Sequence, residues 1–430
     1  MCGFVGLISY NDYYFDKRSL EFLNHRGPDE TNYFLIKEKN YSIHFGHKRL
    51  NILDLEYGKQ PMISSDENLT IIFNGEIYNF KELRSKLEQS GLKFKSKNSD
   101  TEVILNAYLK WGTNLTKYLN GMWAFAIYDK KNNIIFLSRD RFGEKPLYYY
   151  QSKNNFFFAS ETQSLINLDN NIVVDNNSLI KFCSLGFLPG KLTPYKNLFQ
   201  IEAGSNLIYQ IESKQLKYSK YWEYKIEPNY KKTESQLIEE LYFLLDDSTK
   251  KRMVADTEIG ILLSGGLDSS VISYFANKHS SNKLKTFSIN FKEHDFDESK
   301  YAKTVSNKFN TNHYSILFSN NFGYDLQKEI YKCNDLISDS SILPFYLLCK
   351  NTSKKVKVAL GGDAADELFA GYDTFKALKL YNNFNKFVST KKIHPFLRLF
   401  SNLIPIKEYS YMNLKFKIDR FLKFYQNNLA

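Results

Sequence analysis

The spacing of hydrophobic and polar residues differs between the first and second halves of this chain. In the first half, short runs of β-branched and aromatic residues lie between turn residues, which is typical of strands in an antiparallel arrangement of two sheets. Apolar residues at helical spacing predict helices over 80–90, ended by Gly91, and over 101–111. Strands are predicted over 69–73, where the turn dipeptide Asn74-Gly75 would end the strand, and over 123–128, 134–139 and 147–150.

The rhythm changes after residues 214–233, which are polar, aromatic and irregular. Beyond them the pattern predicts helices over 234–254 and 299–309, and strands over 258–263, 285–291 and 355–360. Strands that alternate with helices in this way indicate a parallel α/β sheet covered by helices. We therefore expect two domains, residues 2–213 and residues 234–430, with the junction in the irregular stretch.

Composition narrows the class of protein. The chain has 430 residues, a formal net charge of +11 and 43% hydrophobic residues, which is a globular composition. Basic residues are scattered, so we expect small-molecule substrates and no nucleic-acid partner. The four cysteines show no metal-binding spacing, and no run approaches the roughly 18 apolar residues of a membrane span. Without a signal peptide or a membrane segment, the sequence predicts a cytoplasmic protein.

Candidate chemistry begins at Cys2, directly behind the initiator methionine. Removal of Met1 would give this residue both a thiol and a free α-amine, a known pair of nucleophile and base. Arg49 could bind a carboxylate, and Asn74 with Gly75 offers the two donors of an oxyanion hole. Asp100 could pair with an ammonium group. Each residue taken alone also fits a plain structural reading, as a surface arginine, a hairpin turn or a helix N-cap.

In the second half, Ser264-Gly265-Gly266-Leu267-Asp268-Ser269-Ser270 follows a predicted strand and opens a helix. Glycines there allow a close backbone approach, and a helix N-terminus attracts an anion such as a phosphate. The loop lacks the Gly-Lys-Ser/Thr ending of a Walker A motif. A simple strand-to-helix turn is the alternative reading. A second glycine-rich and acidic stretch, residues 361–372, also directly follows a predicted strand.

The motifs of the first half resemble a known family. Met1-Cys2-Gly3, His25-Arg26-Gly27-Pro28-Asp29, Arg49, Asn74-Gly75-Glu76, Ser99-Asp100-Thr101-Glu102 and Ser138-Arg139-Asp140-Arg141-Phe142-Gly143 occur in this order. They resemble the amino-terminal-nucleophile glutaminase domain of class II amidotransferases, most closely that of asparagine synthetases. The resemblance implies an αββα sandwich in which Cys2 attacks the amide of glutamine and its own amine relays the proton. It also implies that Asn74 and Gly75 hold the oxyanion, and that glutamine is bound by Arg49, Asn74, Glu76 and Asp100.

The second half resembles the N-type ATP pyrophosphatases, whose signatures are the two glycine-rich loops. The resemblance implies that Asp268 and Asp366 hold Mg²⁺, and that Asp363 helps to form an acyl-adenylate and to handle the incoming amine. Gly361 stands where the family has a serine, and Ala364 where it has a glycine. Residues 338–341 match a family segment near the amino-acid acceptor. ATP would be bound by Leu263, Ser264, Gly265, Gly266, Asp268, Ser269, Ile289, Gly361 and Gly362.

Together the two resemblances imply ATP-dependent amidation of L-aspartate to L-asparagine through a β-aspartyl-AMP intermediate, with ammonia from glutamine. Assembly as a homodimer is left open. One alternative is another carboxylate acceptor, as in surface-polysaccharide biosynthesis. A second is a protein that only hydrolyses glutamine, because family members continue past Ala430 and residues 412–425 are rich in apolar side chains. On that ground we expect glutamine hydrolysis to be kept and asparagine formation to be weak or absent.

Overall fold

Strands of the first half form two separate antiparallel sheets in the computed structural model, which describes residues 1–11, 13–292, 297–318 and 336–387. The first sheet has the order β10-β8-β9-β1-β3-β2, and the second has the order β12-β11-β7-β6-β5-β4. All neighbouring strands in both sheets pair antiparallel, so the predicted two-sheet arrangement is confirmed. The first sheet consists of β1 (Gly3–Ser9), β2 (Glu30–Lys37), β3 (Ser42–Arg49), β8 (Tyr148–Gln151), β9 (Asn155–Ala159) and β10 (Leu198–Gln200). The second consists of β4 (Met62–Ile63), β5 (Leu69–Ile77), β6 (Gly121–Asp129), β7 (Ile134–Arg139), β11 (Ser205–Gln210) and β12 (Gln215–Lys220).

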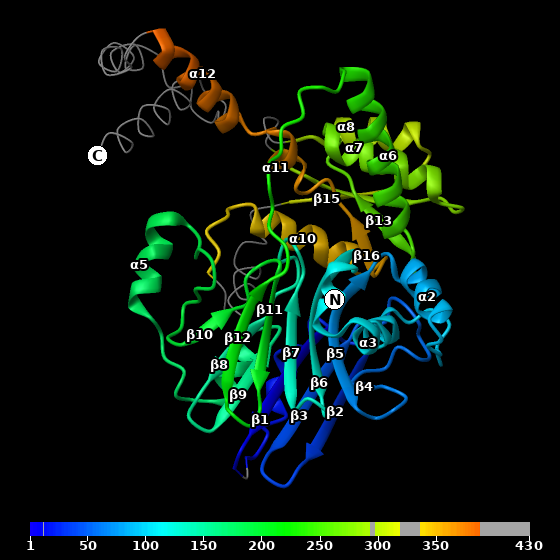
Figure 1. Cartoon of the computed structure of the whole chain (residues 1–430). Coiled ribbons are helices and arrows are strands. Elements are labelled where there is room, and N and C mark those ends of the chain that lie inside the picture. Colours follow the sequence, from blue (N-terminus) through cyan, green and yellow to red (C-terminus); the bar gives the residue numbers. More distant parts are fainter. Residues whose placement is uncertain (12, 293–296, 319–335, 388–430) are drawn as a thin grey trace. The chain divides into compact units, whose positions relative to one another are not determined.

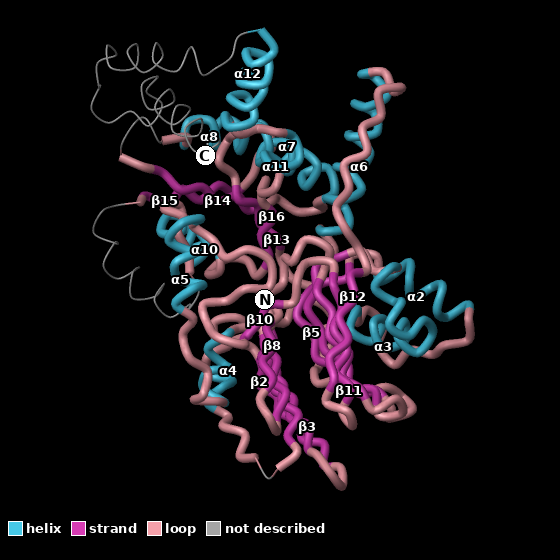
Figure 2. The backbone as a smooth tube through the Cα atoms, turned by 60° about the vertical axis from the view of Figure 1, so that its left-hand side comes forward, coloured by secondary structure: helices cyan, strands magenta, loops and turns pink. Residues whose placement is uncertain are grey.

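Three hydrophobic clusters hold these sheets in a four-layer sandwich. The central cluster joins the facing sides of the two sheets, with Phe45 and Phe158 from one and Ile72 and Leu137 from the other. A second cluster packs α2 (Phe80–Gln89) and α3 (Asp100–Trp111) onto the second sheet. A third packs α1 (Arg18–Glu21) and α4 (Thr162–Leu168) onto the first sheet. Figure 2 shows the order helix, sheet, sheet, helix, which confirms the αββα class.

The strand β5 is longer than the sequence pattern predicted. It does not stop at Asn74-Gly75 but runs on to Ile77, with Asn74 opposite Ala124 and Gly75 opposite Trp123 on β6. Pairing along a full ladder outweighs the turn preference of the dipeptide. A Cβ on Gly75 would lie 2.1 Å from the Met122 carbonyl oxygen, so the glycine is needed for a close strand approach and not for a turn.

The stretch predicted to be irregular, 214–233, contains β12, whose six residues are all exposed. An exposed edge strand shows no alternation of buried and polar residues, and the hydrophobic pattern therefore missed it. Both predicted helices of the first half are present, and Gly91, with φ +90°, follows α2 as expected. The N-cap of α3 is Ser99, whose side chain accepts a hydrogen bond from the Glu102 amide, so Asp100 is not the cap. Further elements of the first half are η1 (Gly112–Lys117) and α5 (Asn176–Leu185).

A four-stranded sheet with the order β15-β14-β13-β16 forms in the second half, and β14 pairs with β15 in parallel. The strands and helices expected there are present, with ends that differ by a few residues, whereas β15, α10, α11 and α12 were not predicted. The strands are β13 (Ile259–Leu262), β14 (Lys285–Asn290), β15 (Asn312–Leu317) and β16 (Val358–Leu360). The helices are α6 (Glu234–Arg252), α7 (Leu267–His279), α8 (Ser299–Lys308), α10 (Ile342–Thr352), α11 (Ala365–Phe369) and α12 (Asp373–Phe387).

By its internal contacts the chain divides into two units, which are described separately below. One unit comprises Met1–Gly260, Lys278–Asn282 and Asn320–Ala359, and the other comprises Ile261–Asn277, Lys283–Ser319 and Leu360–Ala430. Residues 412–425, whose apolar character was noted above, lie outside the described residues. Figure 1 labels the elements of both units.

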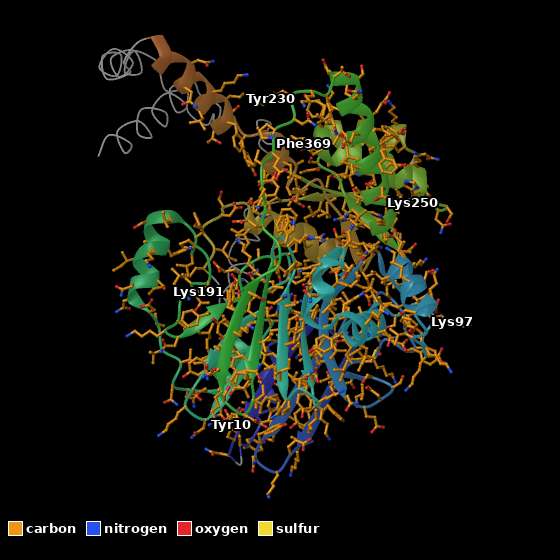
Figure 3. All side chains as sticks on the ribbon, viewed as in Figure 1. Tyr10, Lys97, Lys191, Tyr230, Lys250 and Phe369 are labelled. Atoms are coloured by element: carbon orange, nitrogen blue, oxygen red, sulfur yellow. The ribbon has the colours of Figure 1, made fainter. Side chains whose placement is uncertain are left out.

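Exposed lysines lie at separate places on the first unit, as expected for scattered basic residues. In Figure 3, Lys97 and Lys191 lie in two different loops of the first unit and Lys250 lies on α6, and all three are exposed. Within the part of the chain that the structure describes, no helix has the length and apolar character needed to cross a membrane.

Candidate active sites

Cys2 is fixed by the backbone of a neighbouring strand. The Leu50 amide, just after β3, donates to the Cys2 Sγ at 3.4 Å, and this Sγ lies 3.8 Å from the Leu50 carbonyl oxygen. The Arg26 Nε donates to the Cys2 carbonyl oxygen at 3.1 Å. Burial raises the pKa of the Cys2 thiol, so the thiol is protonated at neutral pH and needs a base to become a nucleophile.

A pocket of about 50 Å³ opens in front of Cys2 within the first unit. It brings together all six residues that the resemblance assigned to glutamine hydrolysis, although they come from the N-terminus, β3, β5 and α3. The lining residues are Met1, Cys2, Arg49, Leu50, Ile52, Leu53, Gly58, Gln60, Phe73, Asn74, Gly75, Glu76, Ser99, Asp100, Thr101, Met122 and Lys145.

Asn74 has a buried side-chain amide that is available to bind a ligand. Its side chain is fully buried, and neither its Oδ1 nor its Nδ2 has a hydrogen-bond partner in the structure. A buried amide without partners is unfavourable by roughly 1–3 kcal/mol. Its position on β5 next to Gly75 gives the pocket one side-chain N–H donor, beside the backbone of a residue that cannot carry a Cβ.

Arg49 is buried, with 3% of its surface exposed, so the reading as a surface arginine is wrong. Its Nη2 donates to the carbonyl oxygens of Leu53 at 3.2 Å and Asp54 at 2.6 Å, and its Nη1 lies 3.3 Å from the Glu30 Oε1. These contacts hold the planar guanidinium in one orientation at the pocket wall. A fixed guanidinium can bind a carboxylate through two hydrogen bonds.

Glu76 and Asp100 form an acidic pair in the same pocket. Burial, followed by the nearby charge of Asp100, raises the pKa of Glu76 to about 7. Burial also raises the pKa of Asp100 to about 6, against the hydrogen bond that its Oδ2 accepts from the Ile77 amide at 3.1 Å. Two buried carboxylates that resist ionisation together would gain from an incoming cation such as an ammonium group.

Two polar residues of the pocket, Gln60 and Lys145, were missed from the sequence. The Gln60 Oε1 accepts a hydrogen bond from the Phe73 amide at 2.6 Å and so fixes the backbone next to Asn74. Lys145 lies two residues after the quoted motif that ends at Gly143, and the continuation of that motif was the available signal. No sequence signal marked Gln60, because only the fold shows that it is buried.

The motif around Arg139 and Asp140 shapes the loop that carries Lys145. The buried Asp140 carboxylate accepts hydrogen bonds from the amides of Trp123, Phe142, Glu144 and Lys145. The Arg139 guanidinium donates to the carbonyl oxygens of Lys145, Gly143 and Ile201. Both side chains therefore support the pocket wall and do not line the pocket.

In the second unit, the loop between β13 and α7 is held by its own hydroxyl groups. The Ser264 Oγ lies 3.0 Å from the Ser269 Oγ and accepts from the Gly266 amide at 3.2 Å. Gly265 has φ +91°, and a Cβ there would lie 2.3 Å from the Ala302 amide nitrogen. The glycine is thus required both by its conformation and by the approach of α8.

The second glycine-rich loop lies against the first. A Cβ on Gly362 would come within 2.7 Å of the Ser269 amide nitrogen and 3.0 Å of the Asp268 carbonyl carbon. Gly361 directly follows β16, and the Leu263 amide donates to the Phe287 carbonyl oxygen on β14, the strand that also carries Ile289. The predicted ATP-binding residues therefore come from one sheet edge and from two adjoining loops. A glycine-rich loop at a helix N-terminus, such as the one that opens α7, can bind a phosphate group.

Asp363 is exposed, and Asp366 lies in the first turn of α11, close to Gly371. Carboxylates such as those of Asp268 and Asp366 are the hard oxygen donors that Mg²⁺ prefers. Among the described residues, no group of three or more His, Cys, Asp or Glu side chains could hold a metal ion on its own. A site built from Asp268 and Asp366 would therefore need oxygens from a bound phosphate, which fits the usual binding of Mg²⁺.

The segment 338–341 lies in the first unit. Its Ser338 hydroxyl donates to the Gly186 carbonyl oxygen at 2.7 Å, and the Asp339 Oδ1 accepts from the Ser341 amide at 2.8 Å. The first contact ties the segment to the residue that ends α5, and the second stabilises a local turn ahead of α10. No contact of these residues marks them as a binding site.

Comparisons with known proteins match each half of the chain to a family of known domains. The model of a glutamine amidotransferase domain matches residues 1–222, and the model of asparagine synthase matches residues 240–422. The putative glutamine-hydrolysing asparagine synthetase 2 of Methanocaldococcus jannaschii is 39% identical over 95% of this chain and 81% of its own length. The glutamine-hydrolysing asparagine synthetases 1 and 3 of Bacillus subtilis are 35% and 32% identical over 87% and 91% of this chain.

This chain spans 60% and 66% of the two Bacillus subtilis relatives, which is less than two thirds of their length. Among solved structures, the glutamine phosphoribosylpyrophosphate amidotransferase of B. subtilis matches 79% of this chain and 94% of its own, with 14% identity and a TM-score of 0.39. The sequence relatives and both domain models, which together cover most of the chain, agree with one another. The chain belongs to the family of glutamine-hydrolysing asparagine synthetases.

Proposed function

We propose that this protein releases ammonia from glutamine at Cys2 and uses it to convert L-aspartate to L-asparagine at the expense of ATP. The observation that carries the proposal is the pocket in which Cys2, a partnerless Asn74, a fixed Arg49 and the acidic pair Glu76 and Asp100 meet. The pocket offers a nucleophile, an oxyanion donor and a group of suitable charge for each end of an amino acid. The family of the chain supports the second half-reaction.

In the first half-reaction, the α-amine that Cys2 gains on loss of Met1 takes the proton of the thiol. The sulfur attacks the side-chain carbonyl carbon of glutamine, and the Asn74 Nδ2–H and the Gly75 amide stabilise the negative oxygen that forms. The protonated amine returns its proton to the leaving nitrogen, so that ammonia departs and a thioester remains. Water then cleaves the thioester and gives glutamate.

Recognition of glutamine would use both ends of its backbone. The Arg49 guanidinium, which Leu53 and Asp54 orient, binds the α-carboxylate. Glu76 and Asp100 bind the α-ammonium group, and this added positive charge favours the ionised form of both carboxyl groups. The ammonium group of the substrate would therefore offset the repulsion between the Glu76 and Asp100 carboxylates.

In the second half-reaction, ATP would react with the β-carboxylate of aspartate to give β-aspartyl-AMP and pyrophosphate, and ammonia would displace AMP. The loop from Ser264 to Ser269 and Gly362 would hold the pyrophosphate part of ATP, and Leu263, Ile289 and Gly361 its adenosine part. Mg²⁺, when bound to Asp268 and Asp366, supplies charge neutralisation at the phosphates. Asp363 would orient the incoming amine.

A single set of measurements tests both halves. Glutamate, AMP, pyrophosphate and asparagine are quantified in one reaction with glutamine, aspartate, ATP and Mg²⁺. The proposal expects asparagine, AMP and pyrophosphate in equal amounts, whereas the expectation of weak asparagine formation stated in the sequence analysis predicts glutamate with little AMP or asparagine. Glutamate without AMP would leave only glutamine hydrolysis, and AMP that depends on a carboxylate other than aspartate would overturn the acceptor.

A further inference from the structure

Lys145 is a charged residue in the glutamine pocket to which the mechanism above gives no task. Only 4% of its surface is exposed, and its Nζ lies 2.6 Å from the Met1 Sδ. Arg49 already serves a carboxylate in the same pocket. A buried ammonium group loses much of its hydration, and this cost must be offset by other interactions.

The backbone of Lys145 is fixed from both sides by buried charged groups. Its amide donates to the Asp140 Oδ2 at 3.0 Å, and its carbonyl oxygen accepts from the Arg139 Nε at 2.8 Å. Asp140 and Arg139 are themselves 1% and 8% exposed. The place of Lys145 beside the N-terminus is therefore built into the fold and is not the result of a flexible surface side chain.

Charged groups from several elements face this place. Arg26 and Arg49 contribute positive charge, and Glu76, Asp100, Asp140 and Glu144 contribute negative charge. Burial lowers the pKa of Lys145, whereas Glu144, Asp140 and Glu76 act in the opposite direction and favour its charged form. Among the described residues, Arg26 and Lys145 are thus cations that act on the amino terminus itself.

We propose that Lys145 is a positioning residue of the glutaminase site, whose ammonium group keeps the α-amine of processed Cys2 free of a proton and so able to accept the proton of the thiol. The proposal rests on the proposed function, because it assigns a task in glutamine hydrolysis. It differs from the roles of Arg49, Glu76 and Asp100, since Lys145 acts on the enzyme's own base and not on the substrate.

The electrostatics at the N-terminus support this role. With Met1 in place, the pKa of the terminal amine is lowered to about 6, first by burial and then by Arg26 and Lys145, against the opposing effects of Cys2 and Glu76. Loss of Met1 moves the amine by one residue, to Cys2, which lines the same pocket as Lys145. The cation therefore lines the same pocket as the residue whose amine must act as base.

The pH dependence of kcat/KM for glutamine hydrolysis tests the proposal in the full chain after mass spectrometry has verified the loss of Met1. Lys145→Gln is expected to move the acid limb to higher pH by about one unit, because the removed charge no longer disfavours the protonated amine. The rate one unit below the wild-type limb would fall about tenfold, and the rate above the limb would stay near that of the wild type. Lys145→Arg should restore the wild-type limb.

The control is Lys59→Gln, which removes one charge from an exposed lysine beside the pocket residue Gln60 and should leave the limb in place. Equal loss of rate at every pH in Lys145→Gln, without rescue by arginine, would reduce Lys145 to a structural role and overturn the proposal. A ¹⁵N NMR titration of the single α-amine in protein labelled with [¹⁵N]cysteine gives a second readout that needs no turnover. A protein that hydrolyses no glutamine would refute the proposed function, and an unshifted titration in Lys145→Gln would refute this inference separately.

Discussion

Asn74 has an unfavourable buried environment in the fold, which the proposed oxyanion contact would explain. Both polar atoms of its side chain are buried without a partner, on a strand that otherwise forms a regular ladder. Replacement by alanine removes the donor assigned to the transition state in the proposed mechanism, but no hydrogen bond present in the structure. We therefore expect Asn74→Ala to lower kcat for glutamine hydrolysis by about 10²–10³, with a much smaller change in KM.

Asn206 provides a matched control for this prediction. It is a buried asparagine on β11, outside the pocket, and its Oδ1 also has no partner. Asn206→Ala should leave kcat within about twofold of the wild type, since Asn206 does not line the pocket and its amide donates to Thr116. Equal losses in the two variants would show that the effect of Asn74 is one of stability.

Ala364 carries a measurable strain. Its φ is +71°, in the left-handed region where the family has a glycine. A Cβ in this conformation costs about 1–2 kcal/mol, part of which a glycine would return through its greater freedom in the unfolded chain. We expect Ala364→Gly to slow hydrogen exchange in peptides covering residues 361–371 by about fivefold, which is roughly 1 kcal/mol. Faster exchange in the variant would contradict this account.

At the scale of elements, the acidic pair joins β5 to the start of α3. Since burial raises the pKa of Glu76 to about 7 and of Asp100 to about 6, both groups bind more protons in the folded than in the unfolded protein. Their contribution to stability is therefore fully present below pH 4 and is lost as the pH rises to 7. Glutamine, with its ammonium group, should reverse this trend because it prefers the ionised pair.

Glutamine binding to the inactive variant Cys2→Ala is accordingly expected to tighten by at least about tenfold between pH 5 and pH 7.5. Isothermal titration calorimetry at several pH values measures the affinity. The double variant Cys2→Ala with Glu76→Gln should show a weaker dependence, since only Asp100 still titrates. An affinity independent of pH in Cys2→Ala would exclude the pair as the ammonium site.

The loop after β7 depends on one carboxylate. Asp140 accepts hydrogen bonds from the amides of Trp123, Phe142, Glu144 and Lys145, and its side chain is 1% exposed. Asp140→Ala leaves these donors without an acceptor and is expected to destabilise the first unit by about 2–4 kcal/mol. Tryptophan fluorescence during urea unfolding reports it, because all three tryptophans belong to this unit. A loss below about 1 kcal/mol would contradict this role of the carboxylate.

Elements with a clear period were accessible from the sequence, whereas those set by tertiary contacts were not. The apolar run in 134–139 reflects a strand buried on both faces, the helical spacing in 80–90 reflects burial on one side, and both elements are present. The exposed β12 and the continuation of β5 through Asn74-Gly75 depend on neighbouring strands, which no local pattern contains. Motifs likewise indicated Cys2 and Arg49, but Gln60 and Lys145 became visible only when the fold placed them in the pocket.

At the scale of the whole molecule, the two proposed reactions are assigned to residues of different units. All glutamine-site residues belong to the first unit, and the residues expected to bind ATP belong to the second. Cys2→Ala should therefore abolish amidation with glutamine while leaving amidation with added ammonium chloride within a few-fold of the wild type. Asparagine assays with each nitrogen source measure this. Loss of both activities in a folded variant would show that Cys2 also serves the second reaction.

Mass spectrometry of the enzyme quenched during turnover with glutamine tests the central claim, the nucleophilic role of a processed Cys2, most directly. The account predicts chains that lack Met1 and carry one γ-glutamyl group, mapped by fragmentation to Cys2 and absent from Cys2→Ala. Turnover by chains that retain Met1, or a γ-glutamyl group on any other residue, would contradict it.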